Sequence, residues 1–133
     1  MRARAWRRLT AGGVPVLVAS SGAEAAEPGR VTLPSGLVAV LQETIREDGP
    51  VMRYRYVADG FDSGAPLAQV AADLEHLCAA DAAPRAAAAG LEAARLVISL
   101  ADRASEFGRA DPQLRQVFEA FRLENGTCIW EAF

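Results

Sequence analysis

The segment that most constrains the fold is the C-terminal stretch 118–133, which reads FEAFRLE, then Asn125-Gly126, then TCIWEAF. Two runs of strand-forming residues flank the dipeptide best suited to the positive φ angles of a two-residue turn, so this stretch predicts a β-hairpin. Pairing across the turn sets three apolar pairs on neighbouring strands: Leu123 with Cys128, Phe121 with Trp130 and Phe118 with Phe133. We therefore expect the hairpin to form part of the core.

A second hairpin is predicted upstream, from residues 37–47 and 51–59 around Asp48-Gly49. Alternation along these strands separates a buried face from a solvated one. The predicted core face carries Leu41, Ile45, Met52, Tyr54 and Tyr56. The predicted solvated face carries Gln42, Thr44, Arg53 and Arg55.

The middle of the chain changes to a helical period between residues 66 and 81. One apolar stripe is formed by Leu67, Val70, Ala71, Leu74, Leu77 and Cys78. Pro84 is expected to interrupt the helix, with a short second helical segment at 85–89. Residues 95–102 are almost continuously apolar and predict an interior strand covered on both faces, followed by a loop over 104–116.

These elements together predict an α+β fold in the order ββ-α-β-ββ. It would be a two-layer sandwich, with a mostly antiparallel sheet of about five strands and one main helix packed on it. Residues 26–36 hold two prolines and two glycines and are expected to form an extended polar leader.

The N-terminus has the composition of a secretory signal. Residues 1–8 carry four arginines, a weakly apolar run follows, and Ala23-Glu24-Ala25 places small residues at a cleavage site. We expect cleavage after Ala25, a single domain over 26–133 and a periplasmic location, the alternative being the N-terminus of a cytosolic protein. A membrane span needs about 20 apolar residues, so no permanent anchor is expected.

The charge balance excludes some partners. Without residues 1–25 the chain holds ten arginines and sixteen acidic residues, a net charge of about −6. Nucleic acid binding requires a basic footprint, so no nucleic acid partner is expected. We expect a monomer whose partner is an unknown protein or small ligand.

The chain has two cysteines, Cys78 on the predicted helix and Cys128 in the C-terminal hairpin. In an oxidising compartment an isolated pair is most simply a disulfide. Redox catalysis favours cysteines close in sequence, as in C-x-x-C, and these two are far apart. A structural Cys78–Cys128 bridge is therefore predicted.

Few residues are suited to catalysis. His76 is the only histidine, and Asp73 precedes it by one helical turn, so the two could form an acid–base pair. Asp102 with Glu106, at the end of the interior strand, is a second candidate for a small hydrolase. The sequence holds no phosphate loop, dinucleotide motif or set of zinc ligands, so we expect no cofactor and no metal.

The solvated face of the second hairpin gives a possible interaction surface, since Arg53 and Arg55 could bind an acidic partner there. Three functions follow: a non-enzymatic binding or interaction module, which is favoured, a small hydrolase, or an envelope assembly factor. The first is favoured because no complete catalytic set is found.

Three stretches match a known pattern: DLEHLC at 73–78, RLVISLADR at 95–103 and FEAFRLENGTCIWEAF at 118–133. Together they resemble a family of small exported alphaproteobacterial proteins of unknown function. The resemblance implies a signal sequence and the same two cysteines. It implies no catalytic residue, ligand or partner.

Overall fold

The computed structural model describes residues 12–13, 29–91 and 94–132, and these contain one six-stranded sheet. Its strands lie side by side in chain order, and every neighbouring pair is antiparallel except β3 and β4. The strands are β1 (Arg30–Thr32), β2 (Val38–Glu47), β3 (Val51–Ala58), β4 (Arg95–Ala101), β5 (Gln116–Glu124) and β6 (Thr127–Glu131). The predicted α+β class and mostly antiparallel sheet are confirmed. The sheet has one more strand than expected, because part of the polar leader pairs with β2 as β1.

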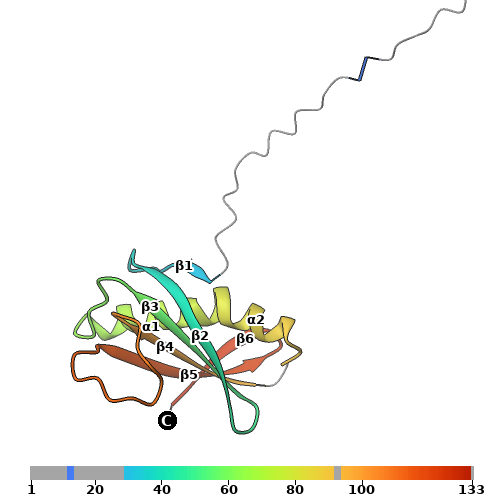
Figure 1. Ribbon diagram of the computed structural model, residues 1–133. Coiled ribbons are helices and arrows are strands. Elements are labelled where there is room, and N and C mark those ends of the chain that lie inside the picture. Colours follow the sequence, from blue (N-terminus) through green and yellow to red (C-terminus); the bar gives the residue numbers. More distant parts are fainter. Residues whose placement is uncertain (1–11, 14–28, 92–93, 133) are drawn as a thin grey trace, which may run out of the picture.

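One continuous helix lies across one face of the twisted sheet (Figure 1). It comprises α1 (Leu67–Leu77), the π-helical turn η1 (Cys78–Ala82) and α2 (Ala83–Ala88). It connects β3 to β4, which are parallel and therefore need a long crossover. The signal peptide predicted at 1–25 lies, apart from Gly12 and Gly13, outside the described residues.

The predicted helix break at Pro84 is wrong, and the π-helical turn explains why. The N–H of Ala83 donates to the carbonyl of Cys78, five residues back, instead of the usual four. Proline lacks an N–H and its ring crowds the carbonyl four residues earlier. A wider turn directly before Pro84 relieves that crowding, so the helix continues through α2.

The core fills the space between this helix and the sheet. Buried side chains come from the helix and from four strands, and the fully buried ones include Leu74, Leu77, Leu96, Ile98 and Leu100. Most of the predicted helical stripe is buried, namely Val70, Leu74, Leu77 and Cys78. Leu67 and Ala71, at its start, are exposed.

A β-bulge in β2 changes which residues share a face. Leu41 pairs with Tyr56, but the next pair joins Glu43 to Arg55, so Gln42 is the extra residue. An inserted residue moves every later side chain to the opposite face. Two assignments within β2 were therefore wrong: Ile45 lies on the face of the arginines, and Thr44 lies on the face of Tyr54.

Strand β4 is covered on both faces, as predicted. Residues 96–101 are all buried. The helix covers one face, and the loop over residues 102–115 folds across the other. This loop contacts β2 and β3, since Ser105 accepts from Gln42 and Arg55.

The C-terminal hairpin has the predicted register. Leu123 pairs with Cys128 and Phe121 with Trp130, and the turn residues Asn125 and Gly126 have φ angles of 49° and 78°. The hairpin forms part of the core, as expected, through Phe121 and Leu123, whereas the side chains of Phe118 and Trp130 are exposed. The Phe118–Phe133 pair falls partly outside the described residues.

Candidate functional site

The first predicted acid–base pair, Asp73 and His76, lies on α1 with its members one turn apart. Asp73 is buried, and its Oδ1 accepts a hydrogen bond of 3.0 Å from the backbone N–H of Ser35. This carboxylate therefore holds the turn between β1 and β2 against the helix. No hydrogen bond or ion pair joins Asp73 to His76 in the described part of the chain. A catalytic role for the pair stays a prediction.

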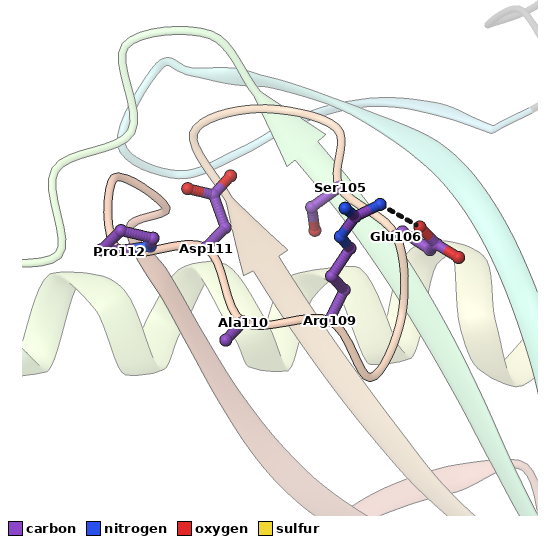
Figure 2. A pocket seen from close by; sticks show the side chains of 6 residues that line it. All are labelled: Ser105, Glu106, Arg109, Ala110, Asp111 and Pro112. Carbon is purple, nitrogen blue, oxygen red and sulfur yellow. Dashed lines mark hydrogen bonds and ion pairs between the residues drawn. The ribbon is translucent and has the colours of Figure 1, made fainter.

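The second pair, Asp102 and Glu106, belongs to the loop that follows β4. The N–H of Arg115 donates to Asp102 Oδ1 at 3.1 Å, and this bond lowers the pKa of that carboxyl group. Glu106 instead pairs with Arg109 at 3.3 Å, on the rim of a depression of about 280 Å³ (Figure 2). The depression is lined by Ser105, Glu106, Arg109, Ala110, Asp111 and Pro112. Asp102 is not among these residues, so the pair does not share that depression.

The two arginines of the proposed interaction face lie under the 102–115 loop. Arg55 is only 4% exposed, forms an ion pair with Glu43 and donates to the carbonyl and hydroxyl oxygens of Ser105. The Arg53 guanidinium stands 5.1 Å from the ring centroid of Phe107. The expectation of a solvated face is therefore wrong for Arg55. Its use as an interaction surface stays a prediction.

A partly buried polar network that the sequence did not indicate links β3 to the helix. Tyr56 donates from its hydroxyl to Asp81 Oδ2 at 2.6 Å, and Arg85 Nε donates to the same oxygen at 2.8 Å. Burial, and then the bond to Asp81, raise the pKa of Tyr56, and burial also raises the pKa of Tyr54. Both phenols are therefore neutral at physiological pH. The network fixes the π-helical turn to the sheet and supplies no reactive phenolate.

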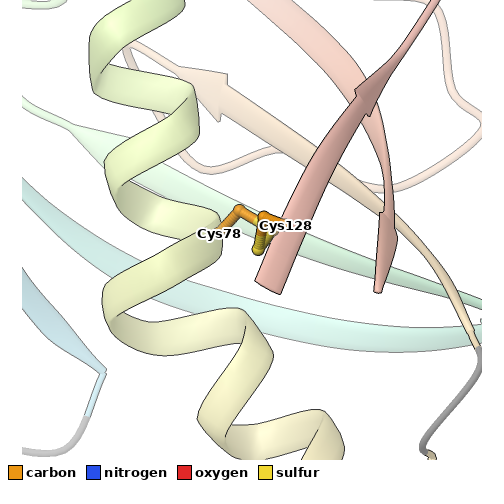
Figure 3. Close-up of a disulfide and its surroundings, with 2 residues drawn as sticks. All are labelled: Cys78 and Cys128. Atoms are coloured by element: carbon orange, nitrogen blue, oxygen red, sulfur yellow. A yellow bond between two sulfur atoms is a disulfide. The ribbon is translucent and has the colours of Figure 1, made fainter. Parts of the chain in front are cut away.

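The predicted disulfide is present. Cys78 and Cys128 are bonded, with their Cα atoms 6.3 Å apart and 50 residues between them in sequence. Figure 3 shows the bridge running from the helix to strand β6. Cys78 directly follows α1, and Cys128 lies on β6, two residues before Trp130. The bond therefore sets the distance between the helix and the β6 edge of the sheet.

An apolar groove of about 210 Å³ lies between α1 and the C-terminal hairpin. It is lined by Leu67, Ala71 and Glu75 from α1, Glu119 and Phe121 from β5, and Trp130 from β6. Leu67 is 81% exposed and Trp130 is 60% exposed. Trp130 Nε1 donates to Glu119 Oε2 at 2.8 Å, which fixes the orientation of the indole ring.

The polar side chains of this groove are acidic. Neither Glu75 nor Glu119 forms an ion pair with an arginine within the described residues. The groove thus combines apolar walls with two carboxylates that form no ion pair with any residue the structure describes. Such a surface attracts cationic groups.

Residues 15–133 match the model of a family described as a family of unknown function, DUF6497. The chain belongs to this family. No curated protein and no solved structure matches the chain.

Two further observations concern metals and membranes. Across residues 12–13, 29–91 and 94–132, no three His, Cys, Asp or Glu side chains gather in a way that could hold a metal ion. Over the same residues, no helix is both long and apolar enough to cross a membrane.

Sequence reasoning missed the groove because the apolar patterns place its two large exposed residues, Leu67 and Trp130, in the core. One signal was available in the sequence: the helical stripe from Leu67 to Cys78 spans about 16 Å along the helix axis. The bridge at Cys78 fixes the helix to β6 only at the far end of that stripe. Leu67 and Ala71, at the other end of the stripe, are therefore expected to lie beyond the contact between the helix and β6.

Proposed function

We propose that this DUF6497 protein is an exported, non-enzymatic binding module of the periplasm, and that the groove between α1 and the β5–β6 hairpin is its binding site. The observation that carries the proposal is the exposure of Leu67 and Trp130 on opposite walls of one groove. Large apolar side chains that line a common concavity and remain in water favour association with a partner. Tryptophan is also among the residues that contribute most to binding energy at interfaces.

The size of the groove favours a polypeptide ligand. Sites for small molecules and cofactors usually enclose about 300–1,000 Å³. This groove encloses about 210 Å³, which suits a single apolar side chain of a protein partner. An envelope assembly role would be one form of this binding.

Export is supported by the basic and then apolar N-terminal residues 1–25 and by the disulfide. In this proposal the mature protein is one domain over 26–133. A cytosolic protein would keep its two cysteines reduced in most bacteria. Fractionation of cells followed by mass measurement of the intact protein tests this part: loss of residues 1–25 and absence of free thiols are expected.

Site-specific photocrosslinking in living cells tests the binding site. A benzophenone amino acid at Ala71, in the groove, should give a covalent adduct with a discrete partner. The same amino acid at Ala88, which is exposed at the end of α2 and outside the groove, is the matched control. Equal adducts at both positions, or none at Ala71 in a folded and exported variant, would refute the groove as the binding site.

A further inference from the structure

The two edges of the sheet are protected to different degrees. β1 has three residues, which makes its edge short. β6 has five residues and pairs with β5 alone in the described part of the chain, so its other side presents unpaired backbone groups. Its sequence, TCIWE, contains no proline or lysine, and its pairing shows no bulge. Proline, lysine and a bulge, three of the devices that usually prevent strand addition, are therefore absent from this edge.

The open edge adjoins the groove, because Trp130 belongs to both. In β6 the side chain of Trp130 is on the same face as that of Cys128, which is bonded to the helix. A strand added to β6 would direct every second side chain to this same face. Such a strand would bring its side chains to the groove mouth while its backbone pairs with β6.

The charges of the groove select the kind of strand. Glu75 and Glu119 lie on opposite walls, and no arginine pairs with either within the described residues. A second copy of this chain would bring the same carboxylates together, and like charges at close range are unfavourable. A cationic segment would instead pair with them.

We propose that the groove binds an extended cationic polypeptide segment, which adds as a strand to the free edge of β6 and places one apolar side chain against Trp130. This inference rests on the proposed binding function and specifies its partner. Side chains two residues apart on a strand are separated by about 7 Å. Arginines two residues before and after the apolar side chain therefore point to the same face of the sheet as Trp130 and Glu119, toward α1 and its Glu75.

The probe is the end-blocked peptide Thr-Arg-Thr-Leu-Thr-Arg-Thr, in which both arginines and the leucine share a face. Trp130 is the reporter, and the Trp6→Phe substitution makes it the only tryptophan of the chain whether or not residues 1–25 are removed. Binding should shift the Trp130 emission to shorter wavelength, since the indole loses water contact. The same peptide with glutamate in place of both arginines should give no shift.

Backbone methylation tests strand addition itself. Peptide N–H groups alternate along a strand, so only one of the two alternating sets can face β6. N-methylation of that set should weaken peptide affinity about tenfold or more. Methylation of the other set should change the affinity by less than about twofold. Equal effects of the two sets would overturn strand addition. A peptide that does not bind at all would overturn the inference as well.

Two protein variants test the place of binding. Ala71→Arg puts a bulky cation into the groove and should abolish the emission shift, whereas Ala72→Arg adds the same charge on the exposed neighbouring position and should change affinity by less than about twofold. The double variant Glu75→Gln/Glu119→Gln should bind the peptide about 2- to 25-fold more weakly. The loss should be smaller at high salt, where the Debye length falls from about 10 to about 3 Å. Equal loss in the Ala71 and Ala72 variants would contradict the inference.

The two proposals fail separately. If the peptide does not bind but photocrosslinking at Ala71 still captures a discrete partner, the groove remains a binding site and the cationic strand is wrong. If neither experiment succeeds, the proposed function also fails. A concentration-dependent dimer that blocks peptide binding would identify a second copy as the occupant and would overturn the inference.

Discussion

Opening the disulfide should remove a large part of the stability of this fold. The bond between Cys78 and Cys128 closes a loop of 50 residues. In the chain-entropy description, a loop of that length reduces the freedom of the unfolded chain enough to stabilise the fold by about 4 kcal/mol. Small domains have total stabilities of about 5–15 kcal/mol, so the loss would be between roughly a quarter and four fifths of the whole.

Urea unfolding of Cys128→Ala and of the double variant Cys78→Ala/Cys128→Ala measures this loss. For small domains the dependence of stability on urea is about 1–3 kcal/mol per molar, so the midpoint should fall by roughly 1.3–4 M. The single variant should lose nearly as much as the double variant, because either one opens the loop. The double variant should lose at most about 1 kcal/mol more, from the smaller side chain at the buried Cys78 position.

Two results would refute this reasoning. A midpoint within about 0.3 M of the wild type would mean that the loop is already restricted in the unfolded chain. A double variant much less stable than the single one would show that packing at Cys78, rather than loop closure, is responsible. Wild-type protein under strong reductant is the control and should unfold like Cys128→Ala.

Three further predictions concern buried polar side chains. Burial and the bond to Asp81 strongly raise the pKa of Tyr56, so this phenol stays protonated in the folded chain; stability should be complete below about pH 10 and should fall above it by about 1.4 kcal/mol per pH unit for Tyr56, while Tyr54, whose pKa burial also raises, adds to the fall, and at most one tyrosinate should absorb before the chain unfolds. Asp81→Asn should destabilise the fold by about 1.5–3 kcal/mol in urea unfolding, more than Tyr56→Phe, which leaves the carboxylate and its arginine paired. Glu43→Gln leaves the buried Arg55 without its anion, whereas Arg55→Met removes the buried charge. Glu43→Gln should therefore destabilise the fold more than Arg55→Met. A thermal melt showing the reverse order would contradict this.

The sequence predicted those parts of the fold that depend on neighbouring residues. Asn125-Gly126 determined the turn and hence the register of the last hairpin, including the position of Cys128. The continuous apolar run of β4 predicted cover on both faces. In both cases local pattern and tertiary packing favour the same conformation.

Other parts depend on contacts between distant residues. The extra residue at Gln42 is held by the loop after β4, since Gln42 donates to the carbonyl of Ser105, 63 positions away. No pattern within β2 indicates that contact. The strict alternation predicted along β2 is therefore wrong for the residues after Gln42. The bond between Tyr56 and Asp81 was missed for the same reason: one residue is in β3 and the other in the helix.

The candidate site results from the same disulfide that stabilises the fold. The helix is bonded to β6 at Cys78, and the apolar stripe of α1 extends about 16 Å from that point to Leu67. β6 runs only three residues beyond Cys128, so it cannot cover the beginning of the helix. Leu67 and Trp130 are therefore left as the two walls of an open groove, at a spacing set by the bond.

It follows that the Cys128→Ala variant, under conditions where it remains folded, should bind the cationic peptide more weakly than the wild type, because the groove walls lose their fixed spacing. Unchanged peptide affinity in this folded variant would separate the disulfide from the site and leave it a purely stabilising role.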